Sequence, residues 1–308
     1  MRRALTGILF LWVLTLLPVE AQYSQYMVNG LVLSPAYAGS RDIFSISGSY
    51  AKTWASFPGA PTYQLLSVHS PLKNDKIALG GLLGSHKQGA YQSLYGSFDY
   101  AFRIRMNKGS VLSFGLRVTA EQKKEDFTQL TFDPADPVFE NNSVFQPNFG
   151  FGVYYYTPRF YAGISMPRMV TYGLSDTAFS GVSASYSPAD YRYMLTTGAM
   201  IGKGGLKWKP SLLMQYYGTT QDFRMDINSM FLFMDERIWL GGSYRMGGEN
   251  LADQIVAILE IKVTPQFMIG YSYDHSLGSY GSLLGGTHEV YLRFEPVHII
   301  KAVNPRYF

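Results

Sequence analysis

The chain is built from segments of about ten residues in which polar and apolar side chains alternate, and turn residues separate the segments. In residues 253–263, for example, every second residue is apolar, and Glu260 and Lys262 lie between them. A period of two is typical of β-strands with one apolar face and one polar face. The pattern predicts an all-β protein with fourteen strands, at residues 43–53, 61–71, 76–87, 91–105, 110–124, 147–157, 159–168, 188–202, 206–218, 223–234, 237–246, 253–263, 265–275 and 287–296.

The composition favours a membrane barrel over a soluble sheet protein. Aromatic residues make up 16% of the chain and charged residues also 16%, whereas about 25% charged residues is usual in soluble domains. After residue 21 there is no run of about 18 apolar residues that could cross a membrane as a helix. A transmembrane β-barrel explains both facts, because its apolar residues occupy alternate positions and never form long runs. A soluble β-sandwich remains the alternative, since alternation alone does not exclude it.

The lengths of the connections provide a second test. The even-numbered connections are tight, with a single residue at Pro158 and at Thr264. The odd-numbered ones include the three longest, residues 125–146, 169–187 and 276–286. Outer-membrane barrels have short periplasmic turns and longer outside loops. We therefore expect a transmembrane antiparallel β-barrel with a periplasmic N-terminus, formed by residues 22–308 as a single domain.

Residues 1–21 have the features of a cleaved signal peptide. Arg2 and Arg3 precede an apolar stretch, and Ala21 supplies the small residue expected at the cleavage site. Residues 22–42 then form a lead-in to the first strand, and we expect this lead-in and the C-terminal tail, residues 297–308, to face the periplasm. The chain contains no cysteine, which excludes disulfide bonds and a lipidated cysteine.

The sequence shows no motif of a known catalytic, cofactor or metal site. Without the signal peptide the chain has 24 basic and 21 acidic residues, too small an excess to indicate a nucleic-acid partner. It contains no zinc-protease helix motif, no Gly-x-Ser-x-Gly elbow and no phosphate-binding glycine loop. We predict a protein that is not an enzyme and has no cofactor. Two weaker alternatives are a Ser/His pair at His275 and Ser276, and calcium binding by the acidic residues of the 125–146 loop.

Charged residues within the predicted strands lie on one face. A charge that faces lipid at mid-depth costs about 2–4 kcal/mol, so we expect the charged faces to point into the barrel. Tyrosines near the predicted strand ends, at 154–156, 191, 193, 271 and 273, are expected to form girdles at the membrane interfaces. The candidate lumen charges are Asp99, Arg103, Arg117, Glu260, Lys262 and Arg293.

Several short motifs resemble the PorP/SprF family of outer-membrane proteins. Residues 25–29 (QYMVN) and 34–40 (SPAYAGS) resemble its opening, with departures at Val28, Gly30 and Ser34. Eight further motifs follow in the family's order, so the resemblance covers essentially the whole mature chain. The positions that match family motifs are Gln25, Tyr26, Asn29, Pro35, Ala36, Tyr37, Gly39, Trp54, Phe57, Pro61, Asp133, Pro137, Trp239, Tyr273, Asp274, His288, Glu289, Pro305, Arg306 and Phe308.

The resemblance implies a non-enzymatic barrel in the outer membrane of a Gram-negative bacterium, as part of the type IX secretion and gliding machinery. Such a barrel would dock, or assist the surface delivery of, partner proteins that carry a type IX C-terminal signal domain, including large adhesins. The implied partners are secretion components, the exported protein and outer-membrane lipid. The alternative is a 14-stranded transporter or porin for small or hydrophobic solutes, and the two hypotheses differ in whether the lumen is open.

Overall fold

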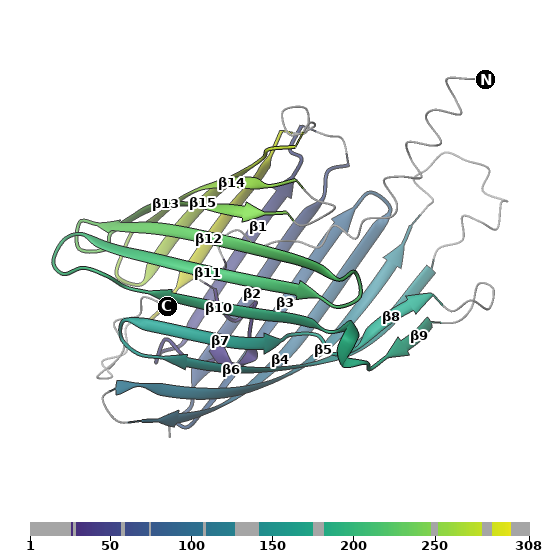
Figure 1. Cartoon of the computed structure of the whole chain (residues 1–308), viewed down its shortest axis with the longest axis horizontal. Coiled ribbons are helices and arrows are strands. Elements are labelled where there is room, and N and C mark those ends of the chain that lie inside the picture. Colours follow the sequence, from purple (N-terminus) through teal and green to yellow (C-terminus); the bar gives the residue numbers. More distant parts are fainter. Residues whose placement is uncertain are drawn as a thin grey trace.

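Fourteen strands form one closed antiparallel barrel (Figure 1). The structure is a computed structural model, and it describes residue 26 and residues 29–56, 59–73, 75–106, 109–126, 142–174, 182–247, 252–278 and 285–296. The barrel strands are β1 (Ser45–Thr53), β2 (Thr62–Pro71), β3 (Ile77–Gln88), β4 (Tyr91–Arg105), β5 (Val111–Glu125), β6 (Asn142–Tyr156), β7 (Phe160–Met166), β10 (Arg192–Ala199), β11 (Lys207–Tyr217), β12 (Asp222–Phe233), β13 (Ile238–Met246), β14 (Gln254–Lys262), β15 (Phe267–Ser276) and β16 (Thr287–Phe294).

Each barrel strand pairs with the next barrel strand along the chain, β7 with β10 included, and β1 pairs with β16 to close the barrel. The connection between β7 and β10 carries a separate two-stranded sheet, β8 (Thr171–Leu174) with β9 (Val182–Ser185), and a 3-10 turn, η4 (Pro188–Asp190). Figure 1 shows this small sheet at one end of the barrel. The predicted fold, a barrel of fourteen antiparallel strands, is confirmed.

The predicted strand bounds differ from the structure most clearly at two prolines. β6 begins at Asn142 and not at 147, because Pro147 sits opposite Ala120 while the strand continues to pair with β5 as far as Asn142 and Glu125. The segment predicted to start a strand at 188 instead forms η4, and β10 begins at Arg192. There Pro188 takes an early position of the turn, and the Ser187 hydroxyl accepts a hydrogen bond from Ala189 N.

The wall has an apolar outer face and a polar inner face. On β5 the side chains of Leu116 and Val118 are more than half exposed, whereas Arg117 and Thr119 between them are 5% exposed. In a closed single-layer barrel, a strand residue with so little exposure faces the interior. Among the described residues, no helix has the length and apolarity needed to cross a membrane.

The structure corrects the expected position of the lead-in. The sequence predicts a lead-in at residues 22–42 that faces the periplasm, but its described residues, Tyr26 and 29–42, lie inside the barrel together with Ile43 and contribute to its buried core. Their 3-10 turn, η1 (Pro35–Tyr37), contacts β4, β5 and β6. The physical reason is the apolar content of this segment: Leu31, Leu33 and Ala36 lose their contact with water only if the barrel encloses them.

The interpretation of tyrosines 154–156 as part of an interfacial girdle was wrong for two of the three. Tyr154 and Tyr156 are each 2% exposed and face the barrel interior, whereas Tyr155 lies on the outer face. Alternation on β6 forces this division, and the ring of Tyr37 packs edge-on against Tyr154, with ring centroids 5.6 Å apart. Inward tyrosines therefore belong to the core.

Candidate functional site inside the barrel

A segment of the chain's own N-terminal region fills part of the lumen. We call Tyr26 together with residues 29–43 the N-terminal plug. At one end the Tyr26 hydroxyl donates to Asp226 Oδ1 of β12 over 3.3 Å. Asn29 Nδ2 donates to Ser67 Oγ of β2 over 3.0 Å. Since β12 and β2 lie on different sides of the closed barrel, the plug crosses the lumen.

The plug satisfies much of its own backbone through consecutive turns. Ser34 N donates to Gly30 O, Ala38 N donates to Pro35 O, and Asp42 N donates to Gly39 O, all within 3.1 Å. Irregular backbone at membrane depth must find hydrogen-bond partners, because lipid offers none. The wall completes the set, since Ser165 Oγ donates to Leu33 O over 2.7 Å and Gly39 N donates to His69 Nδ1 over 3.2 Å.

Two glycines of the wall make room for the plug. A Cβ added to Gly115 of β5 would lie 2.1 Å from Ala36 N, and one added to Gly152 of β6 would lie 2.3 Å from Ser34 Oγ. Real Cβ atoms do not approach other atoms so closely, so Gly115 permits a contact with the plug backbone and Gly152 a contact with the Ser34 side chain that a larger residue would block. The family-like opening of the chain therefore fits against these inward-facing glycines.

An arginine–aspartate pair ties the plug to the wall at mid-strand. Arg117 Nε lies 2.6 Å from Asp99 Oδ1, and both side chains are buried. The same guanidinium donates to Leu31 O over 2.5 Å and to Val32 O over 3.3 Å. Asp99 orients the guanidinium, and the guanidinium in turn satisfies two plug carbonyls, which makes Arg117 the central wall contact of the plug.

Two further ion pairs fix the end of the plug that leads into β1. Arg103 pairs with Asp42 and also donates to the Tyr156 hydroxyl over 2.7 Å. Arg41 pairs with Glu295, just beyond β16, and Ser45 Oγ donates to the same carboxylate over 3.1 Å. Both pairs are almost fully buried, so they connect the plug to opposite flanks of β1 without exposure to solvent.

The pKa of Glu295 reflects this arrangement. Burial by itself would raise the pKa of this carboxyl, but the cations of Arg41 and Arg293 and the hydrogen bonds from Arg41 and Ser45 hold it well below its usual range. For Arg41, burial works to lower the pKa, and the Glu295 carboxylate overcomes that effect and raises it. The two side chains therefore stay charged across the physiological pH range.

The far end of the plug meets a second charge cluster. Arg245 Nε lies 3.0 Å from Asp226 Oδ2, and Arg245 Nη1 lies 3.0 Å from Asp274 Oδ2. Because Tyr26 donates to the same Asp226, the plug reaches a network that joins β12, β13 and β15. The network holds one arginine between two carboxylates and so links three wall strands at the far end of the plug.

The remaining lumen along β11–β16 is filled by the wall's own side chains. Lys209 and Glu260 are completely buried here, and Lys209 Nζ lies 5.3 Å from the centre of the Trp239 ring. The buried apolar side chains on the inner face of this half are Leu213, Met230, Leu232, Trp239, Val256, Ile258, Met268 and Tyr291. Between the plug and the wall, a cavity lined by Tyr26, Tyr37 and Tyr154 among others measures about 10 Å³, roughly the space of one water molecule.

Five of the six candidate lumen charges are buried on the inner face: Asp99, Arg103, Arg117, Glu260 and Arg293, with exposures of 5% or less. Lys262 is half-buried beside the short turn that follows β12, where its Nζ lies 3.2 Å from Glu236 Oε2. Asp99 and Arg117 form one pair, and Arg103 pairs with Asp42. Sequence reasoning missed Asp42 and Arg41 because both lie in the lead-in, before any alternating segment.

The positions that match family motifs divide between the two faces of the wall and the plug. Tyr26, Asn29, Pro35, Ala36, Tyr37 and Gly39 belong to the plug and are buried. Trp239, Asp274 and Glu289 face the interior, whereas Tyr273 and His288 face outward with ring centroids 5.0 Å apart. Trp54 and Pro61 lie in the connection from β1 to β2. Outside the described residues are Gln25, Phe57, Asp133, Pro137, Pro305, Arg306 and Phe308, with the predicted signal peptide and C-terminal tail.

The weaker alternatives find little to support them. His275 and Ser276 are adjacent on β15 and so point to opposite faces of the wall. Within the described residues, no three acidic or histidine side chains lie together as metal ligands would. Most of the acidic 125–146 loop lies outside the described residues.

Known structures share the barrel fold. The CymD monoaromatic hydrocarbon channel aligns with a TM-score of 0.52 at 11% identity, covering 88% of this chain and 93% of that one. A FadL homologue of Pseudomonas aeruginosa (TM-score 0.49, 10% identity, coverage 85% and 92%) and Omp33 of Acinetobacter baumannii (TM-score 0.47, 8% identity, coverage 82% and 98%) are similar. At these identities the likeness concerns the fold alone. No curated protein matches the sequence.

The model of one protein family covers nearly the whole described barrel. The family described as "Type IX secretion system membrane protein PorP/SprF" matches residues 19–294, from the lead-in to the end of β16. With the closed barrel and its apolar outer face, this match places the protein in the outer membrane of a Gram-negative bacterium. The chain belongs to the PorP/SprF family of type IX secretion system membrane proteins.

Proposed function

We propose that this barrel is a docking component of the type IX secretion system, which retains or helps to deliver an exported protein with a type IX C-terminal signal domain. The proposal works by contact and needs no catalysis. The family match supports the link to the secretion system. The filled lumen is the observation that favours docking over transport, because the plug and the apolar residues of β11–β16 occupy the described interior.

The structures that share the fold include channels, so conduction is the second candidate. A conducting pore needs a continuous water-filled path, as in porins. The cavity found beside the plug measures about 10 Å³, which is far too small for a solute. Conduction would therefore require the plug to leave, and its buried ion pairs with Arg103 and Glu295 and its hydrogen bonds from Arg117 oppose that movement.

We place the docking surface at the long connections, residues 125–146, 169–187 and 276–286. The described part of the second one carries the β8–β9 sheet and a group of tyrosines. Tyr186 is 65% exposed, and its carbonyl accepts a hydrogen bond from the Tyr191 hydroxyl over 2.9 Å. Aromatic side chains held in place and exposed to solvent are common anchors of protein interfaces.

The test is copurification from cells in mild detergent, followed by mass spectrometry of what is retained. Replacing residues 172–186 by a short glycine–serine turn removes most of the small sheet without touching a barrel strand. We expect loss of the exported partner while the barrel still folds, as judged by its shift on unheated gels. Shortening 277–286 in the same way is the matched comparison. Retention of an unchanged partner after all three long connections are shortened would contradict the proposal, and channel conductance of the pure protein would then favour transport.

A further inference from the structure

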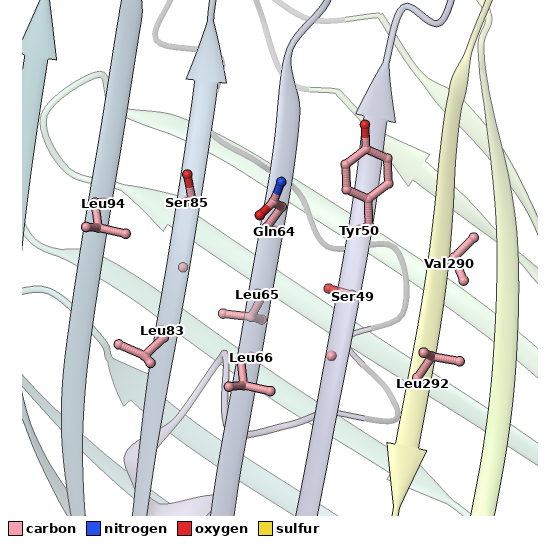
Figure 2. A pocket seen from close by; sticks show the side chains of 12 residues that line it. Ser49, Tyr50, Gln64, Leu65, Leu66, Leu83, Ser85, Leu94, Val290 and Leu292 are labelled. Carbon is pink, nitrogen blue, oxygen red and sulfur yellow. The ribbon is translucent and has the colours of Figure 1, made fainter.

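The outer wall has an apolar hollow that spans β16, β1, β2, β3 and β4. It measures about 500 Å³, within the range of about 300–1,000 Å³ that is usual for small-molecule sites. Figure 2 shows Leu66 and Leu83 on neighbouring strands, with Leu292 on the far side of β1. These leucines are between 43% and 60% exposed and face away from the barrel interior.

A glycine lines the hollow between two of its leucines. Gly48 of β1 lies between Leu66 of β2 and Leu292 of β16 in the strand register. A Cβ added to Gly48 would meet only Leu65 O, at 3.7 Å, an ordinary contact distance. The position is therefore not needed for close packing, unlike Gly115 inside the barrel, and a side chain there would fill the hollow without disturbing the wall.

Polar groups border the hollow on the side of the long connections. Tyr50, Gln64 and Ser85 pair across β1, β2 and β3, and Figure 2 shows them at one end of the hollow. The next outward positions form a basic row across six strands. In register order this row consists of His288, Lys52, Thr62, Lys87, Gln92 and Lys124.

Two lysine side chains of the basic row are available to bind a ligand from outside the barrel. The side chains of Lys52 and Lys87 form no ion pair or side-chain hydrogen bond with the described residues. They are separated by one strand, which places their backbones roughly 10 Å apart. On the opposite wall the outward positions at the same end hold Tyr216, Phe223 and Met246, without a lysine. The positive charge is thus concentrated above the hollow.

We propose that the hollow and the basic row together bind one anionic, phosphate-bearing lipid of the surrounding membrane. Its acyl chain lies over Gly48 between the leucines, the linkage region meets Tyr50, Gln64 and Ser85, and the phosphate lies between Lys52 and Lys87. Lipid is the natural occupant, because every outward residue at this depth faces the bilayer. The charge above the apolar hollow selects an anionic lipid over a zwitterionic one. This site is independent of the proposed docking function.

Native mass spectrometry of the full barrel released from detergent tests the site, with dimyristoyl phosphatidylglycerol and dimyristoyl phosphatidylcholine as probes. We expect one phosphatidylglycerol to bind in preference to phosphatidylcholine. Lys52→Gln with Lys87→Gln should weaken phosphatidylglycerol binding about thirtyfold, since each lysine near anionic lipid contributes roughly fivefold. Gly48→Leu should weaken the binding of both lipids, because the leucine side chain fills the space over residue 48 where the acyl chain lies.

Matched variants separate the site from general effects. Lys73→Gln with Lys203→Gln removes the same charge at the other end of the barrel, and Ala257→Leu adds three of the four carbons that Gly48→Leu adds, on the outer face of β14; neither should change binding. Equal loss with the two lysine pairs, or no loss with Gly48→Leu in a folded barrel, would overturn the proposal. Displacement of the lipid by inorganic phosphate alone would also overturn it, since a soluble anion would then be the ligand.

Discussion

The two halves of the lumen are filled in different ways. Along β2–β7 the interior is occupied by the N-terminal plug, a separate stretch of backbone that needs glycines, hydrogen-bond donors and ion pairs from the wall. Along β11–β16 it is occupied by side chains of the strands themselves, including Met230, Leu232 and Trp239, each fully buried. One half is thus closed by a segment that is not part of any barrel strand, and the other by side chains of the barrel strands themselves.

Buried charge lies in both halves, but its partners differ. Arg103 on the plug half of the wall pairs with Asp42 of the plug, Arg117 donates to plug carbonyls, and Glu295 beyond β16 pairs with Arg41 of the plug. In the self-filled half the wall charges pair with one another, as Arg245 does with Asp226 and Asp274. The three predictions below probe that comparison, beginning with the largest effect.

Arg117→Ala should have the largest effect. It leaves the fully buried Asp99 without its cation and two plug carbonyls without a donor. Removing one partner of a buried ion pair costs about 3–5 kcal/mol. We expect a loss of that size in the free energy of unfolding, measured in detergent by urea titration with circular dichroism. Replacing both partners, Arg117→Met with Asp99→Leu, should restore much of the lost free energy of unfolding but not the hydrogen bonds to the plug. Equal free energies of unfolding for the single and double variants would refute this.

Gly115→Val should release the plug while the barrel stays closed. Its Cβ would overlap the plug backbone at Ala36, and overpacking costs about 1–3 kcal/mol. Because the chain has no cysteine, Ala38→Cys introduces a single thiol that reports on the plug, since Ala38 is fully buried. We expect rapid maleimide labelling of that thiol only when Gly115→Val is present.

The matched comparison lies in the other half of the lumen. Leu232→Ala should destabilise the barrel by about 2–5 kcal/mol through the cavity it leaves, without making the Ala38→Cys thiol accessible. If Leu232→Ala increased labelling as much as Gly115→Val, the two halves would behave as one cooperative core and the comparison would fail.

Glu295→Gln should have the smallest effect on the free energy of unfolding. It tests the pH dependence of the ion pair between Arg41 of the plug and Glu295. The pKa of Glu295 is held well below that of an unfolded glutamate, so the Arg41 pair stabilises the barrel above the unfolded value and loses that contribution only as the pH falls through the lower, folded value. Gln keeps one acceptor, so we expect a loss of roughly 1.5 kcal/mol at neutral pH. The difference between variant and parent should stay constant from pH 7 to pH 5; a difference that vanished by pH 6 would show that the carboxylate is not held by Arg41.

Sequence reasoning identified the wall well because strand alternation is a local property. Charges such as Asp99 and Arg293 could be assigned to one face by counting residues along a strand, and both are buried in the structure. The sequence did not indicate which residue each of these charges pairs with. Arg103 pairs with Asp42, and Arg41 pairs with Glu295 across 254 positions of sequence, and no local pattern relates residues so far apart.

The sequence by itself therefore determined a barrel of fourteen antiparallel strands, the faces of its strands and its membership of the family. Only the tertiary structure decided what fills the barrel. A period of two specifies which residues share a face but not which other segment covers that face. The lead-in shows no alternation of polar and apolar residues from which its position could be predicted. It lies inside the lumen because it contacts Gly115, Gly152 and the Arg117 guanidinium together.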